Sequence, residues 1–341
     1  MAQSSEKKKR RLWYLLFVLF CIGIVAVTAI REFSSVKSAE RISISSLNFN
    51  YLFGALGAYI VLFLSETIKY TCLIYGNTGK FMPLTAFCTA AQGRYYDNIT
   101  PFGAGGQPFE ILYLRKRGLP KGDASAIPLA GFLGPQFAFV FLALACFIFG
   151  PGVNDKLAMR LVAYLGLAFY LAMPAITLMY VFFPNGIGRA VHGCIGFLGR
   201  IRISKDPEKL WQKTEESLNE YRVSMRIILG RPWLLAVVSV CSILYQTAIM
   251  SIPFFVLHAF GGTAGWLETF TMTLYVYATV TIVPTPGNSG AAEGAFYALF
   301  KELQPTSLFW GMLTWRFIVY YMLLLPGLVC VGINAFKEKR K

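Results

Sequence analysis

The sequence is poor in charge and in residues that hold metals. Only 14% of its 341 residues are charged and 56% are hydrophobic, whereas soluble domains carry roughly 25% charged residues. The longest stretch without a candidate membrane span covers residues 184–231, too short for a second domain. These deficits exclude an ordinary soluble protein and predict one integral membrane domain over residues 1–341.

Metal, disulfide and nucleic-acid chemistry lack their usual signals. The two histidines, His192 and His258, lie far apart, and the seven cysteines show no CxxC spacing. We therefore expect no metal, no cofactor and no disulfide framework. The net charge of +15 would suit nucleic acid in a soluble chain, but no aromatic RNA-binding motif accompanies it. We interpret the basic residues, which flank apolar runs, as signals of membrane topology.

Apolar runs of membrane-spanning length occur six times and predict an all-α polytopic fold. A span needs about 20 apolar residues to cross ~30 Å of hydrocarbon. A cleaved signal peptide is the weaker alternative for the first run, because that run is long and no clear A-x-A site follows it. The predicted spans cover residues 12–30, 49–68, 125–149, 158–183, 233–260 and 307–333.

Two further apolar regions, residues 81–114 and 266–303, are broken by proline and glycine. The first contains TPFGAGGQPFE and the second contains VPTPGNSGAAEG, and neither can be a continuous helix. Non-helical backbone survives in hydrocarbon only inside protein or beside a wet cavity. A loop just outside the bilayer would explain either region alone. The shared pattern, Thr-Pro followed by Glu, favours two re-entrant helical hairpins.

Lysine and arginine are distributed unevenly across this predicted topology. With the amino terminus inside, 24 fall on the inner side, including Lys69 and Lys80, and 6 fall outside. The bias fits the positive-inside rule and predicts that both termini lie on the cytoplasmic side of the membrane. The two hairpins then enter from opposite faces, so residues 49–149 and 233–333 form an inverted repeat. Residues 150–232 supply the fourth span and an amphipathic inner-face helix that begins near Asp206 and Pro207.

The broken helices are the expected binding site. A helix amino terminus presents free N–H groups and partial positive charge, which favour phosphate. Further hydrogen bonds are expected from Asn98, Thr100, Gln107, Asn288 and Ser289. Charges at membrane depth are costly and usually paired.

Two arginines fall at membrane depth in this topology. We expect Arg316 to pair with Glu293 or with a lipid phosphate. Arg94 and Asp97, three residues apart, are expected to pair with each other. For that second pair a structural role is as well supported as a functional one.

The broken regions also carry a family resemblance. DNITPFGAGGQPFEILYLRKRGLPKGDASA, TIVPTPGNSGAAEGAF and LTWRFIVYYMLLLPGL resemble successive motifs of the lysylphosphatidylglycerol synthase transmembrane family. This family includes the membrane domain of the bacterial multiple peptide resistance factor. The resemblance implies a flippase-like fold with re-entrant helices, and in the full-length factor this domain moves aminoacylated phosphatidylglycerol to the outer leaflet. The functional candidates that it implies are Pro101, Gly105, Gly106, Glu110, Pro286, Gly287, Glu293 and Arg316.

The resemblance is less informative about activity. Asn288 and Ser289 stand where another glycine is expected, which leaves the substrate open. The family label phosphatidylglycerol lysyltransferase reflects kinship, because these residues include nothing suited to aminoacyl-tRNA. We predict a lipid translocase. The alternatives are an integral-membrane enzyme acting on a lipid headgroup or polyprenyl phosphate, and a non-transporting partner of a separate lipid synthase that docks near Trp211.

Overall fold

The fold consists of helices throughout the described residues. The structure is a computed structural model that describes residues 47–100, 105–150, 157–200, 206–281, 283, 286–288, 290–301, 303 and 307–339. No strand occurs within these ranges, which confirms the all-α prediction. Three predicted features lie outside them: the first span (residues 12–30), Pro101 and Ser289.

Five helical segments among the described residues are long and apolar enough to cross a membrane. They match five of the six predicted spans, and they cover Phe49–Thr78, Lys121–Phe149, Arg160–Phe182, Pro232–Ala259 and Leu308–Asn334. Large apolar side chains such as Phe53 and Phe141 are mostly exposed on these helices. Exposure of such large apolar surfaces to water is unfavourable. The exposed side chains therefore support the conclusion that this is a membrane protein.

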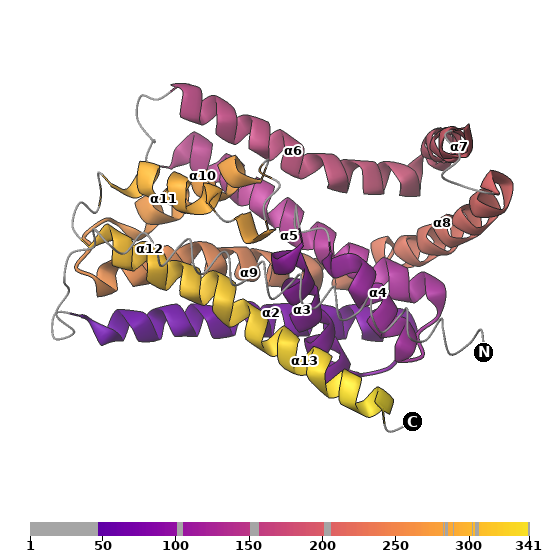
Figure 1. Cartoon of the computed structure of the whole chain (residues 1–341), viewed down its shortest axis with the longest axis horizontal. Coiled ribbons are helices and arrows are strands. Elements are labelled where there is room, and N and C mark those ends of the chain that lie inside the picture. The colour runs from indigo at the N-terminus through magenta and orange to yellow at the C-terminus, as the bar shows by residue number, and fades with distance from the viewer. Residues whose placement is uncertain are drawn as a thin grey trace, which may run out of the picture.

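Two antiparallel helices, α2 (Phe49–Thr78) and α9 (Pro232–Ala259), pack against each other along their length (Figure 1). At one end the Asn48 N–H donates to the Ala259 carbonyl at 3.0 Å, and at the other Arg231 donates to the Gly76 carbonyl. Helix α2 runs ten residues beyond the predicted span and stops at Gly79, whose φ of 69° suits a left-handed cap.

Each broken region folds as a pair of short helices. The first pair is α3 (Pro83–Ile99) and α4 (Gly106–Lys116), and the second is α10 (Trp266–Val280) and α11 (Ala291–Phe300). Within the second break, η4 (Pro286–Asn288) packs against α3. In Figure 1 the α3/α4 pair lies toward the end of the molecule that carries α7 and α8, and the α10/α11 pair lies toward the other end.

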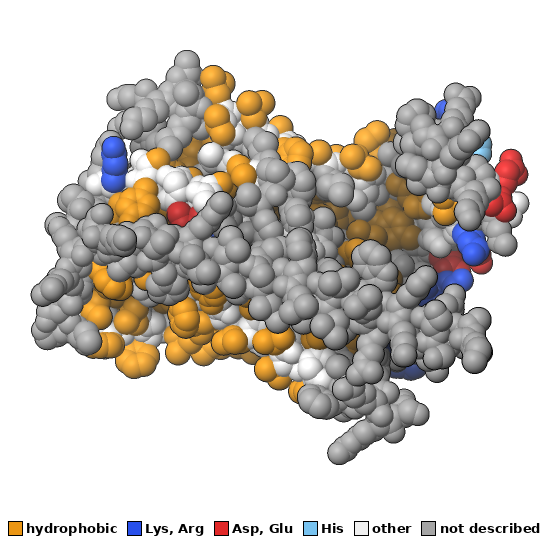
Figure 2. Space-filling model, in the orientation of Figure 1, with side chains coloured by type: hydrophobic (Ala, Val, Ile, Leu, Met, Phe, Trp, Pro, Cys, Tyr) orange, Lys and Arg blue, Asp and Glu red, His pale blue; other side chains and the backbone are white. Residues whose placement is uncertain are grey.

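Four helices follow the first pair along the chain and lead to α9: α5 (Lys121–Phe149), α6 (Leu157–Phe182), α7 (Pro184–Arg200) and α8 (Pro207–Leu229). Helix α8 begins at Pro207, as the sequence predicts, whereas α7 was not anticipated as a separate helix. Helix α8 packs against α5 and buries Tyr221, Met225 and Ile228. Figure 2 shows hydrophobic side chains on the upper and lower parts of the visible face and most visible charges near α7 and α8.

The last span is interrupted immediately after Arg316. It comprises α12 (Leu308–Arg316), the π-helical segment η5 (Phe317–Tyr321) and α13 (Met322–Lys339). Pro326 has no N–H to offer the Met322 carbonyl, and the Tyr59 hydroxyl donates to that carbonyl at 2.9 Å instead. Isolated π-helical turns are frequent at functional sites, which draws attention to Arg316.

Candidate functional site

An ion pair lies buried inside α2. Glu66 and Lys69 are 2% and 0% exposed, and their Oε1 and Nζ atoms are 2.5 Å apart. Lys69 also donates to the Gly131 carbonyl at 2.8 Å. That carbonyl is free because Pro135, one turn later, has no N–H. The predicted end of this span at residue 68 is wrong, because α2 continues to Thr78 and Lys69 is buried inside the protein.

Arg94 joins the same pair from α3. Its Nη2 lies 3.4 Å from Glu66 Oε2, and its guanidinium carbon lies 4.6 Å from the centre of the Tyr245 ring. Glu66 therefore sits between two cations, which offsets much of its desolvation cost. The predicted contact between Arg94 and Asp97 is wrong, although their charges still interact at longer range. The two side chains point to different partners.

Asp97 caps the helix after the first break. Its Oδ1 accepts from the Gly106 N–H at 2.8 Å, and Thr100 Oγ1 accepts from the Gly105 N–H at 2.9 Å. A Cβ on Gly106 would lie 2.5 Å from Asp97 Oδ1, so a larger residue there would displace the Asp97 carboxylate from its capping position. Two of the N–H groups expected to be open for phosphate, those of Gly105 and Gly106, are thus already bonded to protein oxygens. The Asn98 amide is likewise used, donating to the Arg94 carbonyl at 2.8 Å.

Glu110 is a buried carboxylate held by a neutral partner. It is 5% exposed and accepts from the Tyr70 hydroxyl at 2.9 Å. It packs against Gly93, where an added Cβ would clash with Oε1. Gln107, on the same helix, is only partly buried. The first break therefore gathers Asp97 and Glu110 beside Glu66, Lys69 and Arg94.

The second break is fastened to the last span by Arg316. Its Nε lies 2.5 Å from Glu293 Oε1, which confirms the predicted pair, and its Nη2 donates to the Gly287 carbonyl at 3.1 Å. Glu293 Oε2 accepts from the Gly290 N–H, so this helix start is also capped by a carboxylate. Gly287 and Asn288 have φ values of 57° and 55°. Of the other predicted residues, Pro286 lies in η4.

The two breaks meet in the middle of the bundle. Tyr96, Ile99, Tyr320 and Leu324 form one buried cluster that joins α3 to the last span, and an added Cβ on Gly287 would meet the Tyr320 ring. Aromatic rings lie beside both charge groups: the Tyr245 ring faces the Arg94 guanidinium, and the Tyr277 ring packs edge-on against Trp315, the residue before Arg316. Predicted residues from both hairpins are therefore brought together.

Sequence reasoning missed three residues of this site: Glu66, Lys69 and Tyr70. The available signal was the Glu-x-x-Lys spacing inside an apolar run, which places both charges on one helix face. The positive-inside count assigned Lys69 to a surface instead. Among the described residues, no group of three His, Cys, Asp or Glu side chains is arranged to hold a metal ion.

Comparison with known proteins identifies the family of this helix arrangement. Residues 11–327 match the family described as the lysylphosphatidylglycerol synthase TM region. The chain belongs to this family. It is also similar to a UPF0104 membrane protein from Archaeoglobus fulgidus, with 26% identity over 247 residues, covering 71% of this chain and 74% of that protein. No solved structure matches the chain. The sequence resemblance is thereby confirmed.

Proposed function

We propose that this member of the lysylphosphatidylglycerol synthase TM family is a lipid translocase. It binds an anionic phosphate headgroup, such as that of phosphatidylglycerol or its aminoacylated form, between the two helix breaks and moves it between leaflets. The observation that carries the proposal is the placement of Arg94 and Arg316, both deep in an apolar bundle and each beside one break. Charges at such depth usually mark a substrate path.

The carboxylates at the breaks suggest how a headgroup is bound. Glu293 forms an ion pair with Arg316, and Asp97 accepts a hydrogen bond from the Gly106 N–H. A phosphate offers the same arginine and N–H groups more acceptor oxygens than a carboxylate. Headgroup entry therefore requires displacement of Glu293 or Asp97, and this exchange loosens the contact between the second break and the last span. The acyl chains remain in the bilayer.

The membrane arrangement follows the same proposal. Both helix pairs are re-entrant hairpins, and residues 49–149 and 233–333 form an inverted repeat joined by residues 150–232. Movement of one repeat against the other exposes the central site to alternate leaflets. The opposite approach of the two pairs in Figure 1 supports this arrangement. We place the protein in the bacterial plasma membrane with cytoplasmic termini because basic residues collect near α4, α8 and the α13 carboxyl end.

A leaflet-resolved assay tests the translocase. Proteoliposomes carry fluorescent or aminoacylated phosphatidylglycerol, and the fraction reaching the other leaflet is followed over time. We expect Arg316→Ala to lower the rate about a hundredfold, to the level of empty vesicles, because a charged hydrogen bond and the anchor of the second break are both lost. Arg316→Lys should retain part of the rate, since lysine cannot hold Glu293 and Gly287 together.

The control is Arg115→Ala, which removes an exposed arginine from α4 and should leave the rate unchanged. If wild-type vesicles move the probe no faster than empty vesicles, translocation is refuted.

One observation favours an enzymatic alternative: Glu110 is buried beside Tyr70 with no cation in contact among the described residues, a setting suited to proton transfer. Headgroup turnover in the same vesicles, lost in Glu110→Gln, would support that alternative. If the wild-type protein shows neither activity, the remaining role for it is that of a non-transporting partner of a separate lipid synthase.

A further inference from the structure

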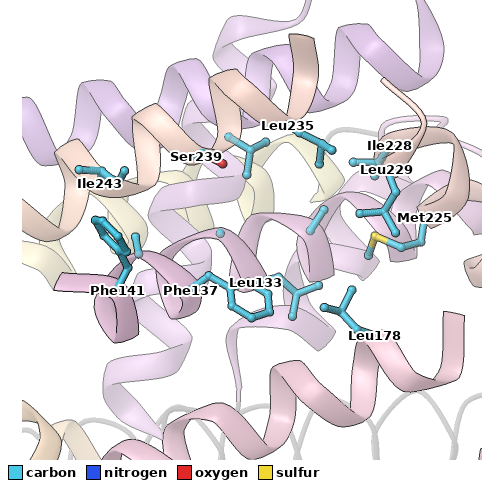
Figure 3. Close-up of a pocket in the computed structure, with 14 residues that line it drawn as sticks. Leu133, Phe137, Phe141, Leu178, Met225, Ile228, Leu229, Leu235, Ser239 and Ile243 are labelled. Atoms are coloured by element: carbon cyan, nitrogen blue, oxygen red, sulfur yellow. The ribbon is translucent and has the colours of Figure 1, made fainter. Parts of the chain in front are cut away.

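An apolar groove lies on the flank of the bundle, away from the charged centre. It has a volume of about 320 Å³ and is bordered by α5, α6, α8 and α9. Figure 3 shows Leu133, Phe137 and Phe141 facing Leu235, Ser239 and Ile243, with α8 side chains closing one end. In Figure 2 a recess lined by hydrophobic side chains is visible between α6 and α8.

The chemistry of the lining identifies what the groove can hold. Of its fourteen lining residues only Ser239 has a polar side chain. A headgroup or a hydrated peptide would leave hydrogen-bonding groups unsatisfied there. Phe137, Phe141 and Ile243 at its edge are 41%, 64% and 37% exposed, and they belong to membrane-spanning helices. The groove therefore opens toward bilayer lipid.

The length of the groove suits one acyl chain. The α5 lining runs from Ala130 to Phe141, about 16 Å at 1.5 Å per residue, close to one leaflet of a ~30 Å hydrocarbon layer. A single hydrocarbon chain of a membrane lipid matches this length, and it needs no hydrogen-bonding partner from the apolar lining.

The α8 end of the groove supplies a place for the headgroup. Residues 222–231 contain three arginines and no acidic residue. Arg226 lies three residues before the lining residue Leu229, on the same side of α8. Arg222 donates to the Val181 carbonyl at 3.0 Å. Arg226 is exposed and makes no ion pair within the described part of the chain. Arginine favours phosphate through paired hydrogen bonds.

We propose that this groove binds one acyl chain of an inner-leaflet glycerophospholipid, with the lipid phosphate at Arg226. None of the central charged residues lines the groove. The two sites are neighbours along α5, because the groove residues Ala130 and Gly134 flank Gly131, whose carbonyl Lys69 contacts. Lipid tails are as apolar as the lining, so retention depends on close packing and on the arginine contact. The lipid binds whether or not the protein translocates lipid.

Photolabelling in nanodiscs tests this site. The probe is a phosphatidylglycerol with a photoreactive diazirine in one acyl chain, and labelled peptides are mapped by mass spectrometry. In the wild-type protein we expect labels to concentrate on residues 130–141 and 225–243. Ser239→Trp fills the groove and should lower this labelling about fivefold through lost packing. Val240→Trp, the matched control, lies on the neighbouring exposed face and should change nothing.

A second probe separates the headgroup from the tail. Arg226→Gln should weaken labelling by the phosphatidylglycerol probe but not by a diacylglycerol probe with the same chains. If Ser239→Trp does not fold, Ala138→Leu narrows the same groove. Uniform labelling of all spans in the wild-type protein would overturn the proposal. An equal loss of groove labelling in Val240→Trp and Ser239→Trp would overturn it as well. Arg316→Ala should leave groove labelling intact, so failure of the translocase would be seen separately.

Discussion

At the scale of single residues, Lys69 illustrates how charge is kept at membrane depth. Its ammonium group is held by Glu66 and by the Gly131 carbonyl that Pro135 leaves free. Arg94 approaches the second oxygen of Glu66. Each charge thus has a partner of opposite sign or a free carbonyl. A buried charge that loses its partner is far more destabilising than a buried pair removed together.

Lys69→Met should therefore destabilise the protein by about 3–5 kcal/mol, because Glu66 and the Gly131 carbonyl would lose their donor. The double variant Glu66→Gln with Lys69→Met should recover part of that loss. The measurement is the unfolding transition of purified protein in detergent, followed by circular dichroism. A double variant no more stable than Lys69→Met would show that the pair is not the stabilising unit.

At the scale of elements, the second break depends on a backbone that only glycine adopts easily. Gly287 has a φ of 57°, and an added Cβ would meet the Tyr320 ring. Its carbonyl is also the acceptor for Arg316. The break, the π-helical segment and the last span are therefore joined at one glycine.

Gly287→Ala should cost about 2–4 kcal/mol, combining left-handed strain with overpacking against Tyr320. Gly57→Ala is the matched control, since that glycine is helical and nothing lies within 4 Å of an added Cβ. Thermal unfolding of both variants in detergent compares them. Equal midpoints for the two alanine variants would mean that the break tolerates a side chain.

The elements also show where sequence patterns succeed. The length of the apolar runs predicted five of the described spans correctly, because a helix in hydrocarbon forms all its backbone hydrogen bonds within itself. Proline and glycine marked both breaks for the same reason. The end of α2 was misplaced by ten residues because Glu66 and Lys69 resemble a span boundary until their buried partners are known.

At the scale of the whole molecule, the two helix pairs approach the centre from opposite ends (Figure 1). Lys80 precedes the first pair, and Lys301 follows the second. If both pairs are re-entrant, these residues face opposite sides of the membrane. Their positions therefore provide a direct test of the proposed topology.

In a cysteine-free background, Lys80→Cys should react with an impermeant maleimide only from the cytoplasmic side. Lys301→Cys should react only from the outer side. Intact right-side-out and inside-out vesicles provide the two conditions, and permeabilised vesicles show total reactivity. Labelling of both cysteines from one side would contradict the inverted repeat.

The sequence by itself determined the helical class, the described spans and the position of both breaks, and it named Glu293 as one of two candidate partners of Arg316. These follow from local chemistry: apolar length, missing N–H groups and the cost of a lone charge in hydrocarbon. Only the tertiary structure decided that Arg94 contacts Glu66, that Asp97 caps Gly106 and that Lys69 is internal. Those contacts join residues whose separation along the chain carries no information about their distance, so packing alone selects them.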